Sequence, residues 1–403
     1  MESQLTSTMN FVSPSSQPVI PTFHAMNFDG IIEVEHEYLK ELTSDQVLSW
    51  YKDMMTVNIL DTIMSDAQRQ GRISFYMVST GEEAITVGSA AALDAGDVIT
   101  CQYRETGVFQ KRGFTLKDFM SQLFSNKNDP GKGRNMPVHY SGKVKTNVHA
   151  VASTLGTQIP HATGAAYALK MNSLENPNDK PQVAVAYFGD GAASEGDFHG
   201  ALNLAATRNC PVIFICCNNG FAISTPTSEQ YRGDGITCRG VSYGIEALRV
   251  DGTDIFAVYL ATKEARRRAL EYGGRPILLE FMSYRVSHHS TSDDSFAYRT
   301  RDEVEPWKQE KNPLERLRKW LQINDLWSQD MEAQARRDIR KNILQELTIA
   351  EKEKKPRLSS IFDDVYAELT EEAEAQREEV RRLIMKYPNE YDVDEYEGGI
   401  SAL

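Results

Sequence analysis

Two apolar segments, each followed by a polar turn, constrain the fold of this chain more than any other feature. The first, VAVAYF, leads into Gly189-Asp190-Gly191, and the second, PVIFICC, leads into Asn218 and Asn219. The stretch between the two turns contains a helical pattern, DFHGALNLAATRN, and has the length of one β-α-β crossover. The two segments therefore predict neighbouring parallel strands in a sheet that is covered on both faces.

The polar turns that follow these strands predict a binding site. The carboxyl ends of neighbouring parallel strands meet at one edge of a sheet, where α/β folds bind ligands. The Asp190 carboxylate and an asparagine amide oxygen are hard ligands that suit Mg²⁺, which completes its shell with phosphate and water. A helix predicted to begin near Asp197 offers free N–H groups to phosphate. Either turn alone is typical of an ordinary helix cap or strand end, so the prediction rests on the combination.

The chain divides into three regions. Residues 1–35 are rich in Ser, Thr and Pro and predict an extended N-terminal arm. Residues 36–300 alternate apolar runs with helical patterns, including a third strand at PILLEFMSYR, and predict an α/β domain whose parallel sheet is flanked by helices. Residues 301–403 are rich in charged residues with helical patterns and predict a helical C-terminal extension.

Composition excludes several classes of protein. The net charge of −13 argues against a nucleic-acid groove, and no apolar run is long enough to cross a bilayer. The five cysteines form no C-x-x-C pair, which argues for reduced thiols inside a cell and against a zinc site or a disulfide framework. The segment MESQLTSTMN lacks Arg and Lys, so it predicts neither a signal peptide nor a transit peptide; a mitochondrial origin stays open if a presequence has been removed.

The strand-GDG-helix-strand-NN arrangement resembles the thiamine-diphosphate-binding motif. From about residue 35 to residue 390 the chain also resembles the α subunits of the branched-chain 2-oxo acid dehydrogenase family, in segments such as RQGRISFYMVSTGEEAITVGSAAALDAGDVI, QYRETGV, GKGRNMPVHY, TQIPHATGAAYA, NNGFAISTPTSEQYRGDGI and YRVSHHSTSDDSFAYR. The HHSTSDD segment separates this family from the pyruvate dehydrogenase α subunits, which are the alternative. The resemblance implies a thiamine-diphosphate-binding fold and the oxidative decarboxylation of 2-oxo acids of the 3-methyl-2-oxobutanoate type, with acyl transfer to lipoyl groups.

The resemblance also implies a cofactor site. Mg²⁺ would be bound by Asp190, Asn219 and the backbone carbonyl of Phe221. Thiamine diphosphate would contact Tyr103, Arg104, Ser153, Leu155, Gly191, Ala192 and His289. Among these, Arg104 would pair with phosphate, and His289 would be the catalytic residue that orients substrate and assists reductive acylation. A K⁺ site would use Ala152, Thr154, Thr157 and Gln158.

The chain departs from the family pattern at two positions. Cys217 stands where the family usually has an arginine, so one cation is missing beside the diphosphate. Ala152 stands where a serine is common, so the K⁺ site loses a hydroxyl. Cys217 is the sole support for another alternative, a non-catalytic scaffold subunit whose cofactor site has decayed.

The family assembles into a complex. The resemblance implies two α and two β subunits on a lipoylated dihydrolipoyl acyltransferase core, in the mitochondrial matrix or, as the alternative, in the cytoplasm. No glutamate here matches the one that activates the cofactor's aminopyrimidine; the family's β subunit supplies it, so the chain alone is expected to be inactive. A regulatory kinase and phosphatase would act on Ser290. This polar loop is expected to be mobile without ligand, and a phosphate there to displace His289.

Overall fold

The computed structural model describes residues 4–403 and is built around a six-stranded, all-parallel sheet in the order β1-β7-β8-β4-β3-β2. Its strands are β1 (Thr22–Phe23), β2 (Val98–Thr100), β3 (Ala184–Gly189), β4 (Val212–Asn218), β7 (Glu246–Asp251) and β8 (Ile277–Met282). A short antiparallel hairpin follows β4 and consists of β5 (Phe221–Ala222) and β6 (Thr225–Pro226). The parallel sheet and the strands predicted from VAVAYF, PVIFICC and PILLEFMSYR are confirmed.

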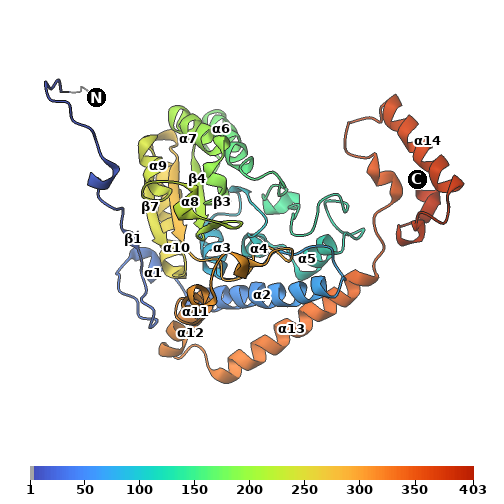
Figure 1. Cartoon of the computed structure of the whole chain (residues 1–403), viewed down its shortest axis with the longest axis horizontal. Coiled ribbons are helices and arrows are strands. Elements are labelled where there is room, and N and C mark those ends of the chain that lie inside the picture. Colours follow the sequence, from blue (N-terminus) through green and yellow to red (C-terminus); the bar gives the residue numbers. More distant parts are fainter. Residues whose placement is uncertain (1–3) are drawn as a thin grey trace.

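Helices cover both faces of this sheet (Figure 1). Along β3, Val185 and Tyr187 pack on one side, whereas Ala184, Ala186 and Phe188 pack on the other. The first side meets α2 (Ser44–Arg69), α3 (Glu83–Ala91) and α10 (Ile255–Ala269), and the second meets α6 (Gln158–Glu175) and α7 (Gly196–Arg208). Because no side of β3 faces water, every position along it is apolar.

Two strands of the parallel sheet were not predicted from the sequence. The segment that forms β7 has no continuous apolar run, because the charged residues Glu246 and Arg249 interrupt it. The extended arm contributes β1, which pairs with β7 at the edge of the sheet. An edge strand needs apolar residues on fewer positions, so its sequence signal is weak.

Nine further α-helices complete the described part of the chain. They are α1 (Glu37–Lys40), α4 (Thr106–Lys111), α5 (Leu116–Leu123), α8 (Thr227–Gln230), α9 (Thr237–Ser242), α11 (Arg301–Gln309), α12 (Pro313–Ile323), α13 (Gln329–Lys352) and α14 (Glu371–Lys386). Within residues 4–403, no helix is both long and apolar enough to span a membrane.

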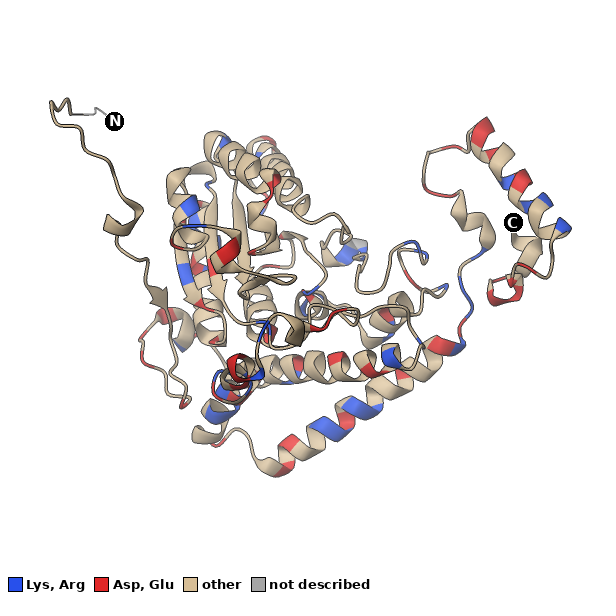
Figure 2. Ribbon diagram, in the orientation of Figure 1, with Lys and Arg blue, Asp and Glu red and all other residues tan. Residues whose placement is uncertain are grey.

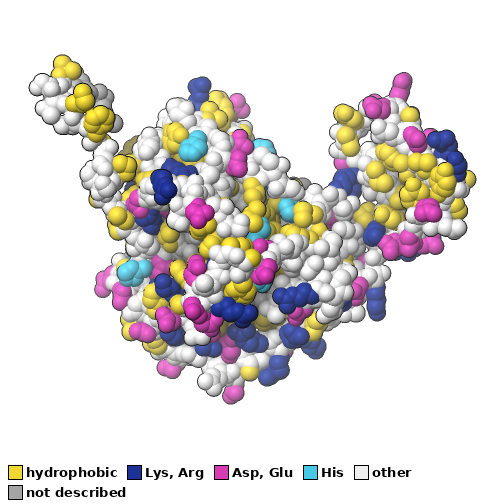
Figure 3. Space-filling view, viewed as in Figure 1, with side chains coloured by type: hydrophobic (Ala, Val, Ile, Leu, Met, Phe, Trp, Pro, Cys, Tyr) yellow, Lys and Arg dark blue, Asp and Glu magenta, His cyan; other side chains and the backbone are white. Residues whose placement is uncertain are grey.

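The C-terminal region is largely helical, as predicted, and has two parts. Helix α13 runs along α2, and Figure 2 shows that Lys or Arg and Asp or Glu residues alternate with other residues along it. The region around α14 lies beyond the end of α13, and Figure 3 shows apolar side chains gathered on it. Its small core consists of Leu358, Phe362, Ile384 and Leu403.

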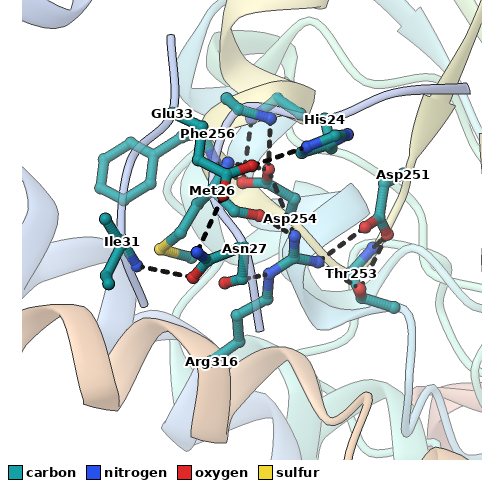
Figure 4. Close-up of polar contacts among 12 residues, drawn as sticks. His24, Met26, Asn27, Ile31, Glu33, Asp251, Thr253, Asp254, Phe256 and Arg316 are labelled. Atoms are coloured by element: carbon teal, nitrogen blue, oxygen red, sulfur yellow. Dashed lines mark hydrogen bonds and ion pairs between the residues drawn. The ribbon is translucent and has the colours of Figure 1, made fainter. Parts of the chain in front are cut away.

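A buried ion pair fastens the N-terminal arm to the α/β domain (Figure 4). Asp254, at the start of α10, is 0% exposed, and its Oδ2 accepts hydrogen bonds from the backbone N–H groups of Ala25 (2.7 Å) and Met26 (2.6 Å). Arg316 of α12 is 2% exposed and lies 3.6 Å from Asp254 and 2.7 Å from the Asp251 carboxylate. It also donates to the Met26 carbonyl. The arm, α10 and α12 are therefore held by one cluster of charges.

Replacing Arg316 with alanine is expected to lower the free energy of unfolding by about 3–5 kcal/mol, because the variant leaves Asp254 buried without its cation. Arg318→Ala is the matched control, since Arg318 lies on the same helix in a partly exposed pair with Glu315 and should contribute less than about 1 kcal/mol. Urea unfolding curves measure both variants. Equal shifts in the two midpoints would contradict a structural role for the buried pair.

Candidate functional site

A cavity of about 220 Å³ opens at the carboxyl edge of β3 and β4. Gly189 pairs with Cys217 across these strands, so the chain leaves both strands at the same level. The cavity brings together nine of the residues predicted for the site: Tyr103, Arg104, Leu155, Asp190, Gly191, Ala192, Asn219, Phe221 and His289. Their meeting at this edge agrees with the expectation from the sequence pattern.

The other predicted site residues lie in the loop before α6 and at the first position of that helix, and they do not line this cavity. They are Ala152, Ser153, Thr154, Thr157 and Gln158. Two of them already use polar atoms within the protein: the Thr157 hydroxyl donates to the Thr154 carbonyl (2.9 Å), and Gln158 Nε2 donates to Gln102 Oε1 (3.1 Å). The K⁺ site stays a prediction.

Asp190 has the properties expected of a cation ligand. Its side chain is 1% exposed, its Oδ2 has no hydrogen-bond partner, and burial raises its pKa to about 7. Nearby, Asn219 Nδ2 donates to Glu82 Oε1 (2.7 Å), which fixes the orientation of the Asn219 amide. A bound cation would satisfy the open carboxylate oxygen and favour its ionised form. Residues 4–403 contain no group of three or more His, Cys, Asp or Glu side chains placed to hold a metal, but the predicted Mg²⁺ set needs only one such residue.

The β5–β6 hairpin presses closely against the Gly-Asp-Gly turn. A Cβ atom on Gly191 would lie 2.9 Å from the Cβ of Ala222, so only glycine allows this approach. At the tip of the hairpin, Ile223 has a φ of 56°, which is a strained conformation for a β-branched residue. Its carbonyl accepts a hydrogen bond from Arg285 Nη2 (2.7 Å), which helps to hold the hairpin against the cavity.

Two arginines hold His289 in its neutral form. Arg104 Nη2 lies 3.2 Å from His289 Nδ1 and donates to the His289 carbonyl (2.8 Å), and Arg285 Nη1 lies 3.4 Å from the same Nδ1. Burial, together with these two cations, lowers the pKa of His289 to about 3. Because Nδ1 faces two donors, it is the acceptor, and the ring proton is on Nε2.

The loop that carries Ser290 is hydrogen-bonded along its length. The backbone N–H of His289 donates to Asp293 Oδ2 (2.8 Å), and the N–H of Thr291 donates to the Tyr76 carbonyl (3.0 Å). Ser290 is 7% exposed, and its hydroxyl accepts from the N–H of Ser292 (3.2 Å). The sequence predicts a mobile loop without ligand, and that mobility stays a prediction.

Sequence reasoning missed four polar residues of the cavity, namely Glu82, Gln102, Glu105 and the exposed Glu195. The sequence pattern could have identified Gln102, because it lies just after the end of β2, as Asp190 lies just after the end of β3. Its Oε1 accepts from the Gly189 N–H (2.8 Å), so it supports the turn directly. Glu82 and Glu105 lie at the starts of helices, where acidic residues are common because they interact favourably with the helix dipole. The amino-acid sequence alone therefore does not distinguish them as binding residues.

The fold and the cavity agree with the comparisons with known proteins. The chain belongs to the family described as the dehydrogenase E1 component, whose model matches residues 51–359. Within that class, it is 48% identical over 389 residues to the mitochondrial 2-oxoisovalerate dehydrogenase subunit alpha of Mus musculus, which covers 96% of this chain and 86% of that protein. It is 47% identical to the corresponding subunit alpha of Caenorhabditis elegans, over 96% of this chain and 88% of that protein. It is also 47% identical to subunit alpha 2 of Arabidopsis thaliana, over 96% of this chain and 80% of that protein.

Proposed function

We propose that this chain is the α subunit of a thiamine diphosphate-dependent 3-methyl-2-oxobutanoate dehydrogenase, an oxidoreductase that passes the acyl group to lipoyl groups. The observation that carries the proposal is the similarity of 96% of the chain to proteins named 2-oxoisovalerate dehydrogenase subunit alpha. Because these relatives are named mitochondrial, the proposed location is the mitochondrial matrix. The pyruvate dehydrogenase α subunit is the alternative on substrate.

The cavity suits a magnesium diphosphate. Asp190, with its open Oδ2, Asn219 and the Phe221 carbonyl would hold Mg²⁺, and Gly191 and Ala192 would offer backbone N–H groups to phosphate. Thiamine diphosphate, when bound, supplies the electron sink for decarboxylation. Arg104 already donates to Val78 and His289, so beyond its predicted pairing with phosphate it orients the histidine.

His289 is proposed as the catalytic residue of this chain. It is neutral at physiological pH, and its Nε2–H is free to donate a hydrogen bond to a substrate oxygen. A neutral imidazole keeps its Nε2 proton while it donates this hydrogen bond to the substrate, whereas an imidazolium would place a third cation beside Arg104 and Arg285. The two arginines therefore select the tautomer that serves this role.

The proposed assembly supplies what this chain lacks. We place two α subunits with two β subunits on a lipoylated dihydrolipoyl acyltransferase core. The β subunit would contribute the glutamate that activates the cofactor. K⁺ would bind in the loop from Ala152 to Gln158.

Reconstitution with the β subunit tests this function. The assembled complex should decarboxylate 3-methyl-2-oxobutanoate and acylate lipoyl groups, and should prefer this substrate to pyruvate, whereas each subunit alone should be inactive. Preference for pyruvate would favour the alternative enzyme. Failure of the complex to bind thiamine diphosphate would favour a scaffold subunit.

Replacing Asp190 with alanine should abolish Mg²⁺-dependent binding of thiamine diphosphate, because it removes the one carboxylate of the metal site. Titration calorimetry on the assembled complex measures this loss, and the thermal midpoint without ligand should not fall, since the variant removes a buried carboxylate whose Oδ2 lacks a partner. Asp179→Ala, in the exposed turn after α6, is the control and should bind normally. Unchanged affinity in the Asp190 variant would disprove the metal assignment.

Phosphorylation of Ser290 is proposed to switch the enzyme off. A phosphate adds about −1.5 to −2 charges, and it would enter a nearly buried position beside Asp293 and next to His289. Repulsion from Asp293 would break the hydrogen bond between Asp293 and the His289 N–H and displace the histidine. The kinase and phosphatase of the family would then control the loop.

The Ser290→Glu variant should therefore lose most of its lipoyl-dependent activity while it still binds the cofactor. Ser292→Glu is the matched control, because Ser292 lies in the same loop but is exposed, and it should keep most of its activity. Turnover and calorimetry on the assembled complex measure both properties. Full turnover by protein verified as phosphorylated on Ser290 would refute the switch.

A further inference from the structure

Two carboxyl oxygens stand out in the part of the chain that the structure describes. Among buried side-chain oxygens of Asp and Glu in residues 4–403, only Asp190 Oδ2 and Glu105 Oε2 lack a hydrogen-bond partner. Both residues line the same cavity. A buried polar atom without a partner is costly, so two of them in one cavity indicate ligand groups on both. The Mg²⁺ prediction accounts for Asp190 and leaves Glu105 unexplained.

No neighbouring group of the protein forms a hydrogen bond with Glu105 Oε2. Glu105 is 3% exposed at the start of α4, and the charged or titratable groups that face it are Glu82, Tyr103, Arg104, Cys101 and Cys217. The guanidinium of Arg104 is directed to Val78 and His289. Burial raises the pKa values of both thiols well above the usual range, so neither cysteine supplies a charge.

The protonation state of Glu105 follows from this surrounding. Burial, followed by the nearby Glu82 carboxylate, raises the pKa of Glu105 to about 8. The carboxyl group is therefore mostly neutral at pH 7 and has an O–H to donate. An anionic ligand in the cavity would meet a hydrogen-bond donor below this pH and a negative charge above it.

We propose that Glu105 is a ligand-binding residue whose protonated carboxyl group donates a hydrogen bond from Oε2 to an anionic oxygen of the ligand, and whose ionisation weakens that binding. The inference rests on the proposed function, in which the ligand is thiamine diphosphate with Mg²⁺. It gives the cavity a polar contact beside Cys217, the position that carries no cation in this chain. Cofactor loading then depends on pH in the range in which Glu105 ionises.

Calorimetric titration of the complex of α and β subunits with thiamine diphosphate and Mg²⁺ tests the inference. Between pH 7 and pH 9 the Kd of the wild type should rise roughly tenfold more than that of Glu105→Gln, which keeps a neutral donor and cannot ionise. At pH 7, Glu105→Gln should bind about as tightly as the wild type, and Glu105→Met, which has no donor, roughly tenfold more weakly. Glu175→Gln, at the exposed C-terminal end of α6 and outside the cavity, is the control and should keep the dependence on pH of the wild type.

Stability of the ligand-free complex gives a second readout. The pKa of Glu105 is higher in the folded chain than in the unfolded chain, so its contribution to stability is present at low pH and is lost as the pH rises through about 8. The thermal midpoint of Glu105→Gln should therefore fall less between pH 7 and pH 9 than that of the wild type.

The outcomes are distinct. Equal dependence of Kd on pH in the wild type and Glu105→Gln would overturn the role of ionisation, and equally tight binding by Glu105→Met would overturn the hydrogen bond. If Glu105→Met does not fold, the comparison of the wild type with Glu105→Gln still tests whether ionisation of Glu105 weakens binding. Absence of thiamine diphosphate binding by every complex at every pH would overturn the proposed function itself, and this inference with it.

Discussion

The parallel pairing of β3 with β4 is the constraint on which the site depends. Both strands are buried on their two faces, so polar side chains emerge only where the strands end. The register that pairs Gly189 with Cys217 makes those ends level and places Asp190 and Asn219 at one edge. A slip of one residue would turn every side chain of one strand to the opposite face and separate the two turns.

Charge at this edge is divided between groups that are paired within the chain and groups that are open. Glu82 is paired with the Asn219 amide, and both arginines nearest to the cavity are used to hold His289. Asp190 and Glu105 keep open oxygens, one suited to a cation and the other to a donor role. On the proposed assignment, these two open oxygens would suit an anion that binds together with its own metal ion.

The sequence predicted the sheet and the meeting of Asp190 with an asparagine at one edge because both follow from strong local signals, whereas the other site residues were expected only from the resemblance to the family. Continuous apolar runs identify β3, β4 and β8, and the turns after β3 and β4 identify Asp190 and Asn219. The signal fails at β7, where Glu246 and Arg249 interrupt the apolar run. The hydrogen bonds between the arginines and His289 Nδ1 join residues up to 185 positions apart, so no local pattern encodes them.

The cluster around Arg316 has a consequence for the order in which the chain acquires its structure during synthesis. The Met26 carbonyl accepts from a guanidinium 290 positions later in the chain, and the Met26 N–H group depends on Asp254. The arm leaves the ribosome on the order of tens of seconds before either partner exists. The arm is made before its partners and is thus among the last segments to be fixed, and until then the edge of β7 stays open to other strands.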